Sequence, residues 1–193
     1  MIETADEHMR AGREADALVA YQEAWSQMQE DVTETQRVWL LLSIANAGVR
    51  CGEFDEALGA LSALPEYYRE SGIVAGNPLF HLLTGLCYHG MNENPEGQVD
   101  NFARALICGG PEIFSGEDPE HLELMMQILR PPAELGTWTG YEGCSRDLMN
   151  GATGFLRELL TAKIGAPPPY IYPREESTPV SGRSKADEDD AEE

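Results

Sequence analysis

The sequence predicts an all-α protein built from stacked helix pairs. Apolar residues recur at steps of three and four positions through most of the first 130 residues, which is the period of an amphipathic helix. Hydrophobic residues make up 42% of the 193-residue chain, enough for one domain with a continuous core. No stretch alternates convincingly between polar and apolar residues at period two, so we expect no β-sheet.

A spaced set of small and aromatic residues recurs after three turns. The copies are Ala17, Tyr21 and Ala24 after Gly12; Leu61 and Leu64 after Gly52; and Gln98, Phe102 and Ala105 after Asn94-Pro95. The closing residues are 40 and then 41 positions apart (64 − 24 and 105 − 64). Small residues let two helices approach closely, and an aromatic residue fills the space beside them. The recurrence predicts repeated helix pairs.

The first half of the chain contains signals for four helices. We expect helices over residues 3–10 and 14–30, and a third that is capped by Thr33 or Thr35 and stopped by Gly52. A fourth is expected over residues 55–69. Pro65 should kink or break it, because proline removes a backbone donor.

The sequence from residue 78 to residue 130 predicts three more helices. One starts at Pro78, a second spans residues 95–107, and a third is capped by Asp118 and ends before Pro131-Pro132. Residues 108–114 lie between the last two. They either shape one end of a binding groove or form a junction that buries Ile113 and Phe114.

The C-terminal part is expected to cap the domain and then to lose regular structure. Residues 145–164 predict an eighth helix over the last repeat, which places a helical-repeat domain at residues 1–166. Residues 167–193 form a Pro-rich strap and a polar, acidic tail that we expect to be disordered. Residues 167–170 match a PPxY peptide of the kind that binds WW domains, or they stiffen the strap.

The charge is strongly one-sided. The formal net charge is −21; residues 174–193 hold eight acidic and three basic residues (−5), which leaves −16 on the rest. Nucleic acids and anionic membranes select basic proteins, so we expect neither as a partner. A basic protein partner fits this charge, and so does a role in solubility alone.

The cysteines and the N-terminus predict a cytoplasmic protein. Four cysteines without a CxxC pair or a tight framework predict free, mostly buried thiols in a reducing compartment. The first residues have neither a basic nor an apolar leader segment, and no apolar run reaches the length of a membrane span. We find no glycine loop for phosphate and no zinc-protease motif, and we expect no cofactor.

The turns and spaced residues resemble the tetratricopeptide repeat over roughly the first two-thirds of the chain. The resemblance is best around residues 12–24 and 52–64, although the period is longer than the family's 34 residues. It implies a concave groove lined by the first helix of each pair. On this chain the groove would display Asp6, Arg10, Trp39, Asn46, Arg50, Leu79, Leu82 and His89. No lysine accompanies Asn46 and Arg50 to complete the carboxylate clamp of some members, and an ordinary solvated helix face remains the alternative.

Two groups of residues suggest catalysis. Cys87 and His89 suggest a thiol–imidazole or metal site, but residues two apart on a helix point in different directions. The acidic residues from Glu112 to Glu120 could supply paired carboxylates, although helix N-termini favour such residues anyway.

We therefore expect a non-catalytic protein-binding module, a scaffold or adaptor that uses the groove or an acidic face. One alternative is a bacterial immunity or chaperone protein that neutralises a basic toxin or effector. Another is an enzyme that uses Cys87 and His89 or the carboxylates. Self-association through an apolar strip of Leu79, Leu82 and Leu86 is a further possibility.

Overall fold

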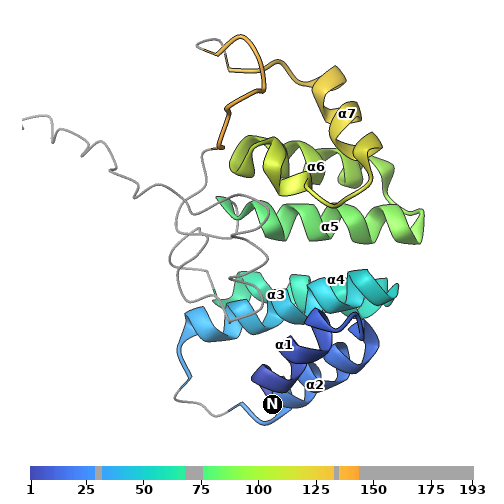
Figure 1. The fold of residues 1–193 in the computed structure, drawn as a ribbon, viewed down its shortest axis with the longest axis vertical. Helices are drawn as coiled ribbons and strands as arrows, with labels where there is room; N and C mark the ends of the chain where they lie inside the picture. The colour runs from blue at the N-terminus through green and yellow to red at the C-terminus, as the bar shows by residue number, and fades with distance from the viewer. Residues whose placement is uncertain (29–31, 68–75, 133–134, 144–193) are drawn as a thin grey trace, which may run out of the picture.

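The computed structural model describes residues 1–28, 32–67, 76–132 and 135–143, and all regular elements in these ranges are helical (Figure 1). The all-α prediction is confirmed for this part of the chain. The elements are α1 (Ile2–Arg10), α2 (Glu14–Ser26), α3 (Glu34–Cys51), α4 (Phe54–Tyr67), α5 (Pro78–Met91), α6 (Pro95–Gly109), the 3₁₀ helix η2 (Pro111–Phe114) and α7 (Pro119–Ile128).

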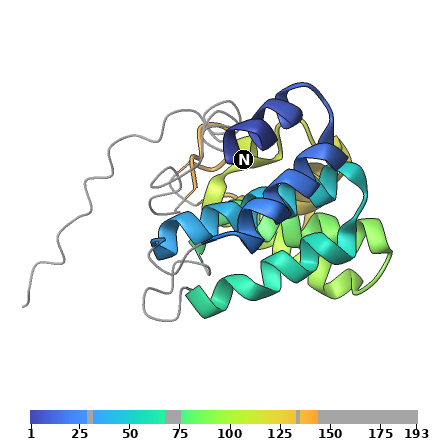
Figure 2. The same cartoon turned by 90° about the horizontal axis from the view of Figure 1, so that it is seen from below.

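Helices that follow one another in the chain pack side by side. Figure 1 shows α1 and α2 at one end of the molecule, then α3 and α4, then α5 and α6, with α7 at the other end. Figure 2 looks along this stack from the α1–α2 end. The turns between α1 and α2, α3 and α4, and α5 and α6 lie on the same side of the stack (Figure 1).

Local sequence signals set most helix boundaries. Thr33 caps α3: its side chain accepts a hydrogen bond from the backbone N–H of Gln36, and the Gln36 side chain accepts one from the backbone of Thr33. Gly52 ends α3 with φ of 86°, a left-handed conformation that glycine adopts at little cost. Asn77 and Asp118 cap α5 and α7, each followed by proline at the first helical position.

The recurring small and aromatic residues form the contacts between helices. All of them are buried except Gln98, which is partly exposed. Two close approaches depend on glycine: a methyl group on Gly48 would lie 3.0 Å from the Ala57 Cβ, and one on Gly85 would lie 2.5 Å from the Phe102 ring. These contacts join α3 to α4 and α5 to α6.

The structure differs from expectation at several boundaries. Helix α2 ends at Ser26 and not at residue 30. Pro65 does not end α4, which continues to Tyr67. Residues 111–114 form η2 with Ile113 and Phe114 buried, which confirms the junction interpretation of that segment.

Cys51, Cys87 and Cys108 are free thiols, as expected. In the ranges that the structure describes, no helix has both the length and the apolar character to cross a bilayer. The predicted eighth helix, the Pro-rich strap with its PPxY match, Cys144 and the acidic tail lie outside these ranges.

Candidate functional site

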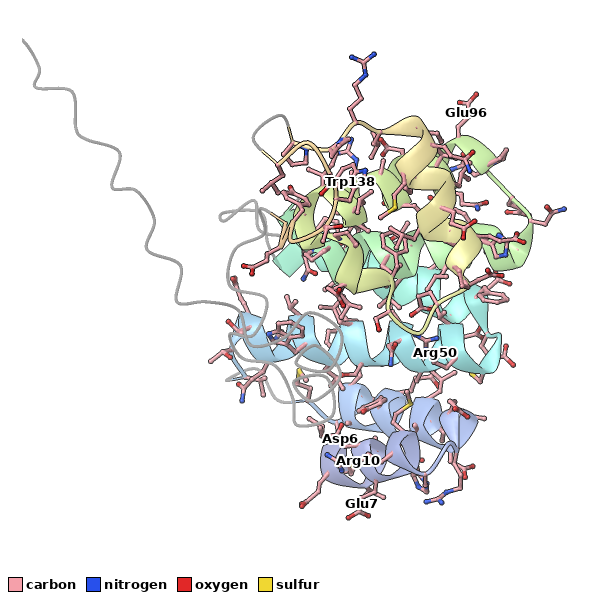
Figure 3. All side chains as sticks on the ribbon, turned by 45° about the horizontal axis from the view of Figure 1, so that its top comes forward. Asp6, Glu7, Arg10, Arg50, Glu96 and Trp138 are labelled. Carbon is pink, nitrogen blue, oxygen red and sulfur yellow. The ribbon has the colours of Figure 1, made fainter. Side chains whose placement is uncertain are left out.

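The eight predicted groove residues lie on the first helices of the three pairs, α1, α3 and α5, but most of them are not open to solvent. Five are at most 4% exposed: Asp6, Trp39, Asn46, Leu79 and Leu82. Arg10, Arg50 and His89 are exposed. Figure 3 shows Asp6 and Arg10 on α1 and Arg50 on α3. A partner can therefore contact the five buried side chains only if the residues that cover them move.

Helix α3 carries a stripe of four residues on the face that points away from α4. Trp39, Ser43, Asn46 and Arg50, which we call the α3 stripe, follow at steps of four, three and four, so they share one face. Gly48 packs against α4 and lies about half a turn of the helical wheel from this face.

The polar groups of the α3 stripe are not all satisfied. The Ser43 hydroxyl donates to the backbone oxygen of Trp39 at 2.8 Å. The Asn46 Oδ1 atom is buried and receives no hydrogen bond from the residues described. An unsatisfied buried acceptor costs about 1–3 kcal/mol, so this atom favours a donor brought by another segment, a ligand or water.

Arg50 binds a carboxylate from a distant part of the chain. Its guanidinium donates two hydrogen bonds to Glu117, of 3.0 and 2.5 Å. The Glu117 side chain is 4% exposed and that of Arg50 is 30% exposed. The pair ties the loop before α7 to the last turn of α3, and it occupies the Arg50 guanidinium.

Two histidines meet beside this ion pair. The rings of His89 and His121 lie 4.6 Å apart, and His121 also lies 4.7 Å from the buried Phe102 ring. Burial lowers the pKa of His121, and the nearby His89 lowers it further, against the opposing effect of Glu117 and neighbouring acidic residues. The shift favours the neutral form of His121.

Asp6, a predicted groove residue, has an internal partner. It accepts a hydrogen bond of 2.6 Å from the Tyr21 hydroxyl, and both residues are buried. Burial first, and then this bond, raises the pKa of Tyr21 above its ordinary value. The contact joins α1 to α2, so Asp6 stabilises the first helix pair.

Several of the residues considered for catalysis are buried or make structural contacts. Cys87 is fully buried, and burial raises the pKa of its thiol to about 12, which opposes formation of a thiolate. Among the acidic residues, Glu117 binds Arg50, and Asp118 caps α7 through the backbone N–H of Glu120. Over the described ranges no three metal-ligating side chains come together.

Acidic residues gather where helices begin. The first turns of α2, α4, α6 and α7 carry a set that we call the acidic edge: Glu14, Asp16, Asp55, Glu56, Glu96 and Glu120. The starts of α2, α4 and α6 follow turns on one side of the stack (Figure 1). The Arg50–Glu117 pair and the His89–His121 contact bring the start of α7 to the ends of α3 and α5 on that side.

Sequence reasoning missed these contacts between helices. It placed Glu117 only in an acidic cluster, since a pair 67 positions apart leaves no local signal. Comparisons with known protein families, curated proteins and solved structures find no significant similarity to this chain.

Proposed function

We propose that this protein is a non-catalytic binding module, a helix-pair solenoid of the tetratricopeptide type, that binds a basic protein partner along the acidic edge. The observation that carries the proposal is the acidic edge itself, within a chain of net charge −21. Each of its carboxylates favours a helix N-terminus. Together they create a negatively charged surface that attracts cationic partners within about a Debye length.

The acidic edge is a better partner surface than the predicted groove in this conformation. All six of its carboxylates belong to residues that are at least partly exposed, whereas five of the eight groove residues are buried. The neighbouring basic residues neutralise only part of it: Arg13 forms an ion pair with Asp16 at 3.7 Å, whereas Arg50 is already bound to Glu117.

The same surface suits two kinds of role. A scaffold or adaptor would hold a basic protein in an assembly, and an immunity or chaperone protein would cover a basic toxin or effector. Both use charge complementarity to accelerate encounter and to select partners. The identity of the partner decides between them.

The first test is an affinity pull-down from the native host with the full chain, at low and at high salt. The edge variant Asp55→Asn/Glu56→Gln/Glu96→Gln removes three charges from the acidic edge. The control Glu3→Gln/Glu7→Gln/Glu23→Gln removes three exposed charges elsewhere on α1 and α2. We expect a stoichiometric basic partner that is captured at low salt, released by salt, lost with the edge variant and kept by the control.

Two results would contradict the proposal. Equal capture by the edge and control variants would mean that net charge, and not this surface, attracts the bound proteins. Capture that is insensitive to salt would indicate an apolar interface instead. If no stoichiometric partner appears, the enzyme alternative becomes the one to test, with a thiol probe on Cys87 as its first step.

A further inference from the structure

Helix α3 is buried on all sides over much of its length. Residues 38–48 are eleven consecutive buried positions, or about three helical turns. Among the described elements, α4 packs on one face of α3, and α2 and α5 pack beside it. The α3 stripe lies opposite α4. The loop that carries Glu117 binds Arg50 at the end of the stripe, and Tyr21 on α2 is within hydrogen-bond reach of Ser43. Asn46 is 2% exposed and has an unsatisfied acceptor, so this part of the stripe needs a cover that the contacts above do not supply.

The described chain ends on the side of the stack where the α3 stripe begins. Gly143 packs against Cys108 and Gly109 at the end of α6, and Gly109 lies beside Pro78, the first residue of α5. At their other ends α3 and α5 also lie together, because Gly90 near the end of α5 contacts Phe54 just after α3. The two helices are parallel, so the chain leaves Gly143 on the side where α3 begins.

The segment that follows matches the length and the pattern of the stripe. Residues 145–164 would form a helix of about 30 Å, and the 18 residues of α3 span about 27 Å. Leu148, Ala152, Phe155 and Leu159 follow at steps of four, three and four, as the members of the α3 stripe do. Two further residues, Gly151 and Gly154, are small enough for close helix packing.

Charge also favours this segment. Residues 145–164 hold three basic and two acidic residues, a net charge of +1 in a chain of −21. An acidic body attracts its own basic segment over any acidic partner.

We propose that residues 145–164 dock as a helix along the α3 stripe and so fill the predicted groove. The occupant is then part of this chain, and the groove is closed until the segment leaves. This inference rests on the geometry of α3 and does not depend on the acidic edge binding a partner.

Hydrogen exchange of the full chain tests the docking. Phe155→Asp places a charge on the apolar stripe of the segment, and Asn150→Asp adds the same charge on its opposite face as the matched control. We expect the amides of residues 38–48 to exchange at least about tenfold faster in Phe155→Asp than in the control, with α6 and α7 unchanged. Unchanged exchange in α3, or faster exchange in α6 and α7 instead, would overturn the proposal.

A second measurement on the wild-type chain decides the matter if Phe155→Asp unfolds the protein. A zero-length carbodiimide crosslinker joins lysine amines to carboxylates, and Lys163 and Lys185 are the only lysines in the sequence. Docking predicts a link from Lys163 to Glu53, just after the end of α3. Links to Asp100 or Glu123 on α6 and α7, or no link to α1–α4, would refute it. Neither measurement needs a partner, so both stay informative if the acidic edge binds nothing.

Discussion

Gly85 shows how one residue sets the distance between two helices. It lies on α5 against the ring of Phe102, which is fully buried. We expect Gly85→Ala to lower the free energy of unfolding by about 1–3 kcal/mol, because the added methyl group would overlap the ring. Denaturant unfolding followed by circular dichroism measures this change.

Gly59→Ala is the matched control. Gly59 is also helical, but a methyl group there meets nothing within 4 Å. Alanine should stabilise the protein by about 0.5–1 kcal/mol at this position, through helix propensity alone. If the two variants were equally stable, the close approach of α5 and α6 would not limit the fold.

His121 should make the stability depend on pH. Burial first, and then His89, lowers its pKa in the folded state below the ordinary value of 6.5. The unfolded chain therefore binds the proton more readily than the folded protein. The contribution of His121 to the free energy of unfolding falls as the pH drops from 6.5 toward the pKa of the folded state. We expect His121→Gln to flatten this slope, measured by denaturant unfolding between pH 5 and pH 8.

His8→Gln provides the comparison for the loss of a histidine elsewhere. His8 lies on α1, where Arg13 donates a hydrogen bond to its ring at 2.9 Å. The slope should change less in His8→Gln than in His121→Gln. The same slope in His121→Gln and wild type would show that His121 does not contribute to the pH dependence.

At the scale of elements, the Arg50–Glu117 pair holds the loop before α7 on α3. Arg50→Met leaves a carboxylate that is 4% exposed without its partner, and we expect a loss of about 2 kcal/mol in the free energy of unfolding. The double variant Arg50→Met/Glu117→Leu should be more stable than Arg50→Met, because it removes the stranded charge. A double-mutant cycle by chemical denaturation measures the coupling.

Arg104 supplies the control for this cycle. Its ion pair with Asp100 on α6 has a distance of 2.8 Å, but both side chains are more than half exposed. Solvent screens such a pair, so Arg104→Met should change the free energy of unfolding by no more than about 0.5 kcal/mol. If Arg104→Met lowered the free energy of unfolding as much as Arg50→Met, the burial of Glu117 would not explain the contribution of the Arg50–Glu117 pair.

At the scale of the whole molecule, the net charge of −21 should destabilise the folded state through self-repulsion. We expect the melting temperature to rise as sodium chloride increases from about 0.02 to 0.3 M, because salt screens exposed charges. Differential scanning calorimetry would show this, and the edge variant should respond less than wild type. A melting temperature that stays constant or falls with salt would contradict the prediction.

The helices could be predicted because their signals are local. Thr33 with Gln36, Gly52, and Asn77 before Pro78 act through hydrogen bonds and backbone preferences within a few residues, and the structure confirms each of them as a boundary. The predicted end of α2 was less accurate. The end of a helix depends on packing where the sequence has no strong stop signal. No such signal follows Ser26.

The sequence by itself determined the helical fold over the described residues, the burial of the recurring small and aromatic residues, and the acidic charge. Each follows from local periodicity or composition. The tertiary structure alone decided that five of the eight groove residues are buried, that Arg50 is bound by Glu117, and that the acidic helix starts on α2, α4 and α6 share one side. These facts depend on how the helices stack, and contacts between residues far apart in the chain leave no pattern in a single sequence.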